Sequence, residues 1–222
     1  MDFKPRNHGM VAAVLCTVAS LACAGTVFAN ASDPGGSGYP DQTASGRQAM
    51  LGEVVTFRGK ALSGTRMAVQ RLQDGSWVTV ATGTAGRNGH YVASWRTDHA
   101  GVFKTRTVPA GGAGVRAASA EDSGDMTVYR RAVSTWYGKG WYGRKTACGQ
   151  TLSPTLMGVA NKTLPCGTMV RFYFRGRSVT VPVIDRGPYG KGISWDLTTA
   201  AADALDFTST GKGTVGAIPV RP

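Results

Sequence analysis

The C-terminal part of this 222-residue chain, from residue 131 onward, contains no histidine and no glutamate. A thiol nucleophile there would lack its usual base, and a transition metal would lack most of its usual ligands. The glycine-rich segment GPYGKG also lacks the Gly-Lys-Ser/Thr sequence of a phosphate-binding loop. We therefore expect no metal and no cofactor, and a site whose acid–base chemistry rests on aspartate.

Acidic residues are scarce along the whole chain. Asp and Glu together number 13 against 25 Lys and Arg, which gives a formal net charge of +12. A charge of this size favours a polyanionic partner, and nucleic acid, teichoic acid, anionic lipid and anionic glycan all qualify. Strongly helical segments are few while glycine is abundant, with 31 residues. The chain is therefore expected to be all-β with many turns.

The first 31 residues show the three parts of a secretory signal. Lys4 and Arg6 precede an uncharged apolar run that begins at Met10, and the small residues Ala29 and Ala31 stand at the spacing that signal peptidase reads. A retained membrane anchor is the alternative, because the apolar run is long for a signal. We expect a secreted or cell-envelope protein with no nucleic-acid partner, which touches a membrane only through this segment if it stays uncleaved.

Export also bears on the cysteines. Two of the four cysteines lie in the signal segment, so Cys148 and Cys166 remain in the rest of the chain. Two cysteines in an exported chain most simply form a disulfide. A metal pair would need further ligands and a catalytic thiol would need a nearby base, and the surrounding sequence contains neither.

Composition divides the rest of the chain into four segments. Residues 32–46 are rich in Gly, Ser and Pro, which is typical of a flexible linker. Residues 47–110 contain short alternating strands separated by turn signals, which predict an immunoglobulin-like β-sandwich. Residues 111–130 form a second linker, and residues 131–222 form the last domain. Three aromatic residues are expected to fill the core of the sandwich: Trp77, Trp95 and Phe103.

The last domain contains a predicted hairpin and a predicted short helix. Apolar residues alternate on both arms of the segment 168–185, with Gly176 in the turn. The segment LTTAAADAL indicates a short helix that Thr198 can cap. Asp185 and Asp196 lie on either side of the glycine- and proline-rich loop between these two elements.

The last domain also carries five linked segments in a fixed order: WYG, GRKTACGQ, LPCGT, GRSVTVPVIDRGP and WDLT. These segments resemble the rare lipoprotein A (RlpA) family of septal-ring lytic transglycosylases, and the resemblance covers about residues 134–220. It implies a six-stranded double-psi β-barrel with one short helix, a fold shared with expansins and family 45 glycoside hydrolases. It also implies an exported cell-wall protein that binds and remodels peptidoglycan glycan strands, or another anionic cell-wall polysaccharide.

The functional positions of this family fall on four residues of the sequence. The aspartate of the family's DRGP motif is Asp185, and the aspartate of its DLS motif is Asp196. The position of a usual glutamate is occupied by Gln150, and that of a usual histidine by Asn161. Neither amide can give or take a proton near neutral pH, so two ionisable groups of the family pattern are missing.

Two functions are compatible with this pattern. The first is a lytic transglycosylase centred on Asp185, whose carboxyl group would act in turn as acid and base, with Asp196 as a second candidate catalytic residue. The alternative is a non-catalytic, expansin-like polysaccharide-binding module, because the family's glutamate and histidine are replaced. A turn-forming role for Asp185 and a structural role for Asp196 also remain open. Four residues are the candidate glycan contacts in either case: Tyr137, Gln150, Asn161 and Arg186.

Overall fold

The computed structural model of the chain describes residues 46–111 and 124–220. The expected signal segment 1–31, nearly all of the linker 32–46 and most of the linker 111–130 lie outside these residues and stay predictions. Within the described residues, no helix is both long and apolar enough to span a membrane.

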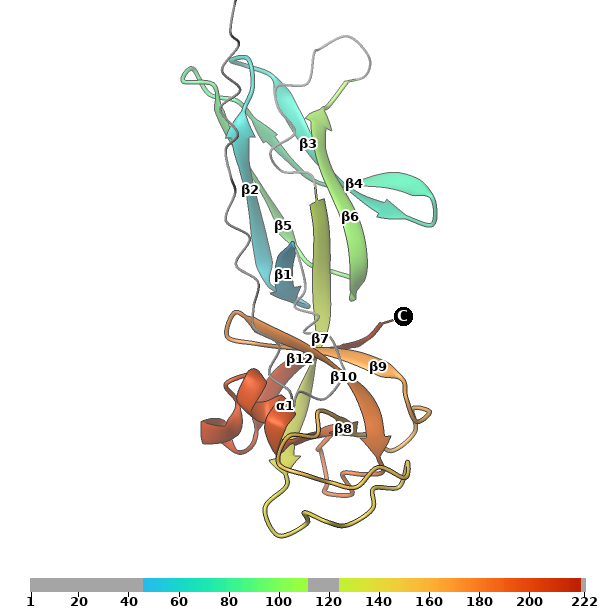
Figure 1. Cartoon of the computed structure of the whole chain (residues 1–222). Coiled ribbons are helices and arrows are strands. Elements are labelled where there is room, and N and C mark those ends of the chain that lie inside the picture. The colour runs from blue at the N-terminus through green and yellow to red at the C-terminus, as the bar shows by residue number, and fades with distance from the viewer. Residues whose placement is uncertain (1–45, 112–123, 221–222) are drawn as a thin grey trace, which may run out of the picture. The chain divides into compact units, whose positions relative to one another are not determined.

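Strands dominate the described chain, and Figure 1 labels most of them. The front part contains β1 (Arg47–Met50), β2 (Val54–Lys60), β3 (Arg66–Gln73), β4 (Ser76–Thr84), β5 (His90–Arg96) and β6 (Gly101–Pro109). The long strand β7 (Gly124–Tyr137) follows. The back part contains β8 (Val159–Ala160), β9 (Met169–Phe174), β10 (Arg177–Asp185), β11 (Trp195–Thr198), α1 (Thr199–Ala204), the 3-10 helix η1 (Thr208–Thr210) and β12 (Gly213–Pro219).

Six strands close into a barrel in the back part of the chain. Their order is β7, β12, β9, β10, β8 and β11, and β11 pairs again with β7. The predicted hairpin is β9 and β10, with Phe174 opposite Arg177 and with Gly176 in the turn at a φ of 87° that favours glycine. The prediction of an all-β chain with a six-stranded barrel and one short α-helix is therefore confirmed for the described residues.

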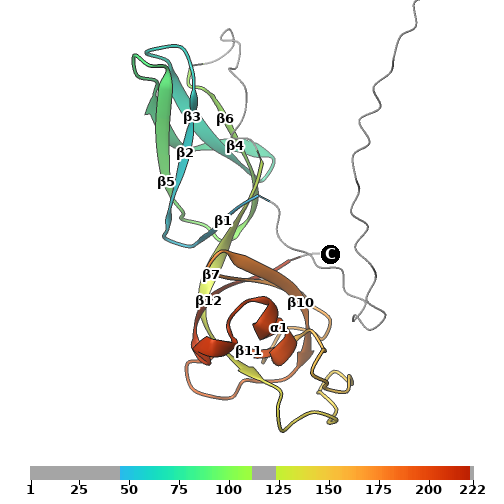
Figure 2. The ribbon, with the colours of Figure 1, turned by 60° about the vertical axis from the view of Figure 1, so that its left-hand side comes forward.

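Alternate residues of the strands fill the interior of the barrel. On β9, Val170, Phe172 and Phe174 are buried, while the residues between them are partly exposed. Phe172 packs edge-on against Trp195 of β11, with ring centroids 5.3 Å apart. Helix α1 packs against β10 and β11 (Figure 2). Thr198 caps it as predicted, because its hydroxyl oxygen accepts a hydrogen bond from a backbone amide of the helix at 3.4 Å.

The front part does not support the expected separate immunoglobulin-like sandwich over residues 47–110. Among the described residues, only β2 and β5 form a second sheet, while β1, β3, β4 and β6 join the same sheet as the barrel strands. The physical reason is the length of β7, whose 14 residues pair with β1 and β6 at one end and with β11 and β12 at the other. Turn signals predicted separate strands, but they do not reveal that one strand serves both parts.

The three aromatic residues expected in the front core have two different positions. Trp95 and Phe103 lie in that core, with ring centroids 6.5 Å apart. Trp77 does not, since it pairs with Leu72 and carries the Arg106 guanidinium 4.1 Å from its ring centroid. Strand alternation explains the difference, because the core-facing residues of β3 have odd numbers and Leu72 lies on the opposite face.

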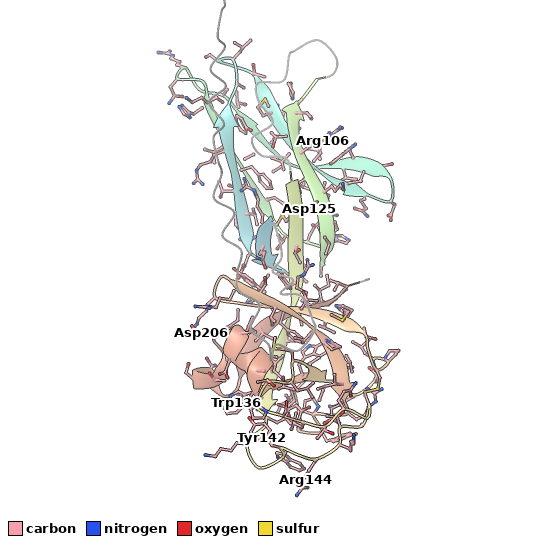
Figure 3. All side chains as sticks on the ribbon, viewed as in Figure 1. Arg106, Asp125, Trp136, Tyr142, Arg144 and Asp206 are labelled. Atoms are coloured by element: carbon pink, nitrogen blue, oxygen red, sulfur yellow. A yellow bond between two sulfur atoms is a disulfide. The ribbon has the colours of Figure 1, made fainter. Side chains whose placement is uncertain are left out.

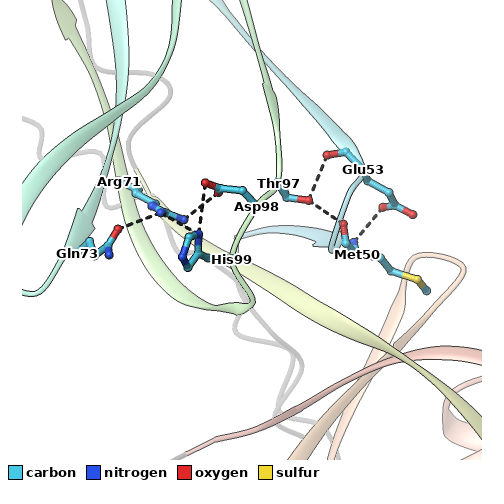
Figure 4. A network of polar contacts seen from close by, with 7 residues as sticks. All are labelled: Met50, Glu53, Arg71, Gln73, Thr97, Asp98 and His99. Atoms are coloured by element: carbon cyan, nitrogen blue, oxygen red, sulfur yellow. Dashed lines mark hydrogen bonds and ion pairs between the residues drawn. The ribbon is translucent and has the colours of Figure 1, made fainter.

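A buried arginine connects the two sheets of the front part (Figure 4). Arg71 of β3 is 3% exposed, and its guanidinium donates hydrogen bonds to Asp98 Oδ1 at 3.1 Å and Gln73 Oε1 at 2.9 Å. The same guanidinium lies over the rings of Trp95 and Phe103. A buried charge is tolerated when it is paired and hydrogen-bonded in this way.

The predicted disulfide between Cys148 and Cys166 is confirmed. Cys148 lies in the long loop between β7 and β8, and Cys166 lies between β8 and β9. The backbone amide of Cys148 also donates to the carbonyl oxygen of Ile184 on β10 at 3.1 Å. The disulfide therefore ties the long loop to the segment before β9, and the hydrogen bond holds this loop against the strand that carries Asp185.

Replacing both cysteines of this bond with serine is expected to lower the free energy of unfolding by about 3 kcal/mol. The reason is that the unfolded chain regains the freedom of a closed loop with a sequence separation of 18. The midpoint of urea unfolding measures the change, and reduced wild-type protein should unfold at the midpoint of the variant. Equal midpoints for the oxidised wild type and the variant would contradict the prediction.

Candidate functional site

Two aspartates lie on either side of β8, the shortest strand of the barrel. Its Ala160 pairs with Asp185 of β10 and also with Asp196 of β11. On the far side of β11, Asp196 pairs with Thr135 of β7. Residues in register on neighbouring strands point to the same face of a sheet. The pairing of β10 with β8 has a register irregularity between Val183 and Asp185. The four residues form a row across four strands, and both carboxyl groups line the same cavity.

A cavity of about 580 Å³ opens over this row. Both aspartates, Ala160, Tyr137 and the loop 186–189 line it. Because Ala160 contributes only a methyl group between the two carboxyl groups, the space above the row stays open. Figure 3 shows the side chains at this end of the barrel and labels Arg144. The long loop between β7 and β8 adds three further lining residues: Trp141, Arg144 and Lys145.

The carboxyl group of Asp185 is held at both of its oxygens. Oδ1 accepts hydrogen bonds from the backbone amides of Ala147 at 2.9 Å and Arg186 at 2.8 Å. Oδ2 accepts a hydrogen bond from the hydroxyl of Tyr137 at 3.3 Å. Ala147 precedes Cys148 in the loop that the disulfide fixes. The disulfide therefore supports the orientation of the Asp185 carboxyl group.

The carboxyl group of Asp196 lies in a different environment. Its Oδ1 accepts a short hydrogen bond of 2.6 Å from the hydroxyl of Thr135. Burial raises the pKa of Asp196 above its usual range, the hydrogen bond from Thr135 opposes the rise, and the charge of Asp185 adds to it. A raised pKa favours the protonated form that a general acid needs.

Tyr137 lies on the cavity wall beside Asp185. Burial raises the pKa of its hydroxyl far above the usual range, and the charge of Asp185 and the hydrogen bond to it raise this pKa further. The phenol therefore stays protonated and donates to the carboxyl group. Its position is compatible with the predicted role as a glycan contact, which stays a prediction.

The guanidinium of Arg186 points to backbone and sulfur atoms. It donates hydrogen bonds to the carbonyl oxygens of Asn161 at 3.3 Å and Asp185 at 3.5 Å, and it lies 3.3 Å from Sγ of Cys166. Among the ion pairs of the described residues, none joins Arg186 to the Asp185 carboxylate. Arg186 therefore lines the cavity without pairing with the aspartate before it.

The two amide residues at the altered family positions are engaged in turns. Gln150 Oε1 accepts a hydrogen bond from the hydroxyl of Thr146 at 2.9 Å. Asn161 Oδ1 accepts hydrogen bonds from the backbone amides of Thr163 at 3.1 Å and Leu164 at 2.9 Å. Neither Gln150 nor Asn161 is among the residues that line the cavity. Their predicted role as glycan contacts stays a prediction, with no support from this geometry.

The cavity also presents two exposed aromatic residues, Trp141 and Tyr189, of which sequence reasoning missed Tyr189. Trp141 is 54% exposed and Tyr189 is 81% exposed, and the Arg144 guanidinium lies 4.9 Å from the centroid of the Trp141 ring. The neighbouring Trp136 and Tyr142 instead donate hydrogen bonds to Thr208 and Thr199 on the helical side of the barrel. The sequence places four aromatic residues between positions 136 and 142, but their spacing alone does not separate exposed rings from packed ones.

The site offers little to a metal ion. Within residues 46–111 and 124–220, no group of three or more His, Cys, Asp or Glu side chains is placed to hold a metal. The two carboxyl groups over the cavity instead accept hydrogen bonds from protein donors. What this arrangement can do chemically is transfer protons between two carboxyl groups and a ligand.

The comparisons with known proteins concern the barrel. Residues 130–221 match the family model described as lytic transglycolase, a double-psi β-barrel domain. The chain is 40% identical over 85 residues to a probable endolytic peptidoglycan transglycosylase RlpA of Synechocystis, with 37% of this chain and 26% of that protein covered. It is 41% identical over 85 residues to the corresponding protein of Aquifex aeolicus, with 37% and 38% covered. The predicted resemblance of the last domain is confirmed, although the match spans well under half the length of these relatives.

Two solved structures show a partial likeness to the chain. A papain inhibitor of Streptomyces has 26% identity and a TM-score of 0.32, with 39% of this chain and 90% of that chain covered. A mutant expansin of Clavibacter michiganensis, in complex with cellohexaose, has 21% identity and a TM-score of 0.35, with 41% and 50% covered. At these TM-scores neither likeness carries an argument about function.

The raised pKa of Asp196 predicts a pH-dependent effect on stability. The protonated carboxyl group favours folding, and this contribution is complete below the unfolded pKa of about 3.9 and lost as pH rises through the higher folded pKa. The variant Asp196→Asn keeps an oxygen that can accept from Thr135 but carries no charge. We expect it to melt at the wild-type temperature in acid and at a higher temperature at neutral pH.

Thermal unfolding followed by circular dichroism across this pH range measures the difference. The variant Asp203→Asn, at an exposed aspartate of α1, controls for the loss of one carboxyl group from the same domain. A neutral-pH melting temperature of Asp196→Asn below that of the wild type would show that the ionised carboxylate stabilises the fold, contrary to this account.

Proposed function

We propose that the C-terminal barrel binds glycan strands of peptidoglycan in the cavity above β8 and cleaves them as a lytic transglycosylase. The observation that carries the proposal is the row that brings Asp185 and Asp196 to one cavity in two different environments. The family model that matches residues 130–221, and relatives described as endolytic peptidoglycan transglycosylases, support the same substrate class.

Asp196 is the proton donor in this proposal. Its raised pKa favours the protonated carboxyl group, which gives its proton to the glycosidic oxygen as the bond from that oxygen to C1 breaks. Asp185 then takes the proton of the sugar's 6-hydroxyl as that oxygen attacks C1 and closes a 1,6-anhydro ring. No water is consumed, and solvent returns the proton from Asp185 to Asp196 before the next turnover.

The rim of the cavity suits a wall glycan. The exposed rings of Trp141 and Tyr189 can pack against the apolar faces of sugar rings. Arg144 and Lys145 place two positive charges beside them. These cations can pair with the carboxylates of muropeptides or the phosphates of teichoic acid. The rim therefore supports a long, anionic, sugar-based ligand.

Wall binding without cleavage is the second candidate function. It is favoured by Gln150 and Asn161, because the residues at these family positions are amides engaged in turns and not ionisable groups facing the cavity. Under this alternative, Asp185 and Asp196 are sugar hydrogen-bonders, and the barrel organises wall polymer in the manner of an expansin.

Either function requires export to the cell envelope or beyond. The signal predicted at residues 1–31 would provide it, and the linker predicted at 32–46 would follow. We propose the division of the remaining chain into a front domain at residues 47–110, a linker at 111–130 and the barrel domain at 131–222. β7 crosses the end of that linker without a break, so the two domains share this strand.

A digest of purified sacculi and of glycan strands without stem peptides separates the two functions. We expect the wild type to release 1,6-anhydroMurNAc products, detected by mass spectrometry in the soluble fraction. Asp185→Asn and Asp196→Asn should each lower the release by about 10²–10⁴-fold, because each removes a proton-transfer group. Asp203→Asn is the matched control and should release product at the wild-type rate.

Binding to sacculi is measured on the same proteins at low and raised salt, since salt screens non-specific attraction of a basic protein. Retained binding with no product from the wild type would contradict cleavage and support the binding module. Absence of binding at low salt would contradict both functions.

The exposed ring of Trp141 gives a separate prediction for binding. Trp141→Ala should weaken binding to sacculi at raised salt by about 3–10-fold, which is the usual loss for one aromatic contact. Val102→Ala, at an exposed apolar residue of β6, is the control and should bind as the wild type does. Equal affinity of Trp141→Ala and the wild type would show that this ring does not contribute to glycan binding.

A further inference from the structure

We propose that the exposed face of the β2–β5 sheet is a second binding surface, for an anionic polymer whose charges are phosphodiester groups. This surface belongs to the front part of the chain and contains none of the residues that line the barrel cavity. It is therefore independent of whether the barrel cleaves glycan.

The face is defined by strand alternation and register. β5 alternates strictly between exposed and buried residues, and its buried residues include Ala93 and Trp95 of the front core. The antiparallel register with β2 then places one outward residue of β2 opposite each exposed residue of β5. Four rows result: Lys60 with His90, Arg58 with Val92, Thr56 with Ser94, and Val54 with Arg96.

This face carries positive charge without any acidic residue. Arg58 and Lys60 are both exposed and stand two residues apart on β2, so their Cα atoms are about 7 Å apart on the same face. Arg96 lies at the other end of the face, two rows beyond Arg58. Among the ion pairs of the described residues, none involves Arg58, Lys60 or Arg96. The guanidinium of Arg96 donates a hydrogen bond to the carbonyl oxygen of Gly52 at 2.8 Å and keeps its positive charge. No carboxylate therefore neutralises these three cations before an anionic ligand binds.

The other side chains of the face indicate which anion fits. The hydroxyl oxygens of Thr56 and Ser94 lie 3.5 Å apart in the row between the cations, and hydroxyls donate to anionic oxygens. A guanidinium such as that of Arg58 can bind two oxygens of one phosphate. Successive rows along the face therefore carry the cation Lys60, the cation Arg58, a pair of hydroxyl groups and the cation Arg96. A linear polymer with one phosphodiester in each short repeat can use every row.

Other polyanions use features that this face lacks. Single-stranded nucleic acid is usually held by aromatic side chains on which its bases stack, and none of the eight residues is Phe, Tyr or Trp. A membrane-surface element usually inserts Trp, Phe or Leu between the headgroups. This face has only the smaller apolar residues Val54 and Val92, which are 52% and 53% exposed. Because these valines lie beside the cations, an anionic membrane is the main alternative ligand to the phosphodiester polymer.

The test compares two variants that lose the same charge. Arg58→Gln/Lys60→Gln removes two cations from the face, and Arg177→Gln/Lys212→Gln removes two exposed cations from the barrel. Binding to a glycerol phosphate polymer is measured at several salt concentrations. The face variant should bind about tenfold more weakly than the wild type and show a salt slope smaller by about 1–2. The barrel variant should stay within about twofold.

Three results would overturn the proposal. The first is an equal loss of polymer binding in both double variants, which would show that only the net charge of the protein matters. The second is unchanged binding by the face variant, with melting temperatures showing that both variants are folded. The third is binding of polyglutamate, or of vesicles of phosphatidylglycerol and phosphatidylcholine, that is as tight as binding of the glycerol phosphate polymer and depends on the same two residues.

Discussion

The register of β8 between β10 and β11 is the constraint on which the site depends. Because Ala160 pairs with both aspartates, one two-residue strand sets the positions of Asp185 and Asp196 together. A shift of one residue in either pairing would turn a carboxyl group to the other face of the sheet. The closure of the barrel through β11 and β7 then brings Thr135 to Asp196. The positions of both carboxyl groups over the cavity follow from this one arrangement of backbone.

Two identical side chains acquire different chemistry within this row. Asp185 accepts hydrogen bonds from two backbone amides and from a tyrosine hydroxyl, and the disulfide-bonded loop provides one of those amides. Asp196 is partly buried, and this burial together with the neighbouring charge raises its pKa. A carboxyl group with a raised pKa beside a second carboxyl group is an arrangement that acid–base catalysis on a sugar can use. The loss of ionisable groups at Gln150 and Asn161 is compatible with this chemistry, because both aspartates of the row are retained.

Local patterns in the sequence predicted the features that depend on residues close together in the chain. The β9–β10 hairpin, the Thr198 cap and the pairing of Cys148 with Cys166 each follow from short spacings or from the choice among few partners. The contact between Thr135 and Asp196 spans 61 positions, and no periodicity in the chain encodes it. The same limit applies to β7, because the sequence suggests a domain boundary near residue 130 and does not reveal that one strand crosses it. It applies also to Trp77, since the face of the sheet on which this side chain lies depends on the register of β3.

The most direct test of this account is the titration of Asp196 by carboxyl-carbon NMR in the wild type and in Asp185→Asn. If the two carboxyl groups share one cavity, Asp196 titrates above the usual aspartate range in the wild type. Removal of the Asp185 charge then lowers its pKa, because that charge contributes to the rise. A pKa of Asp196 that is ordinary in the wild type, or that does not change in Asp185→Asn, would contradict the pairing on which the proposed chemistry rests.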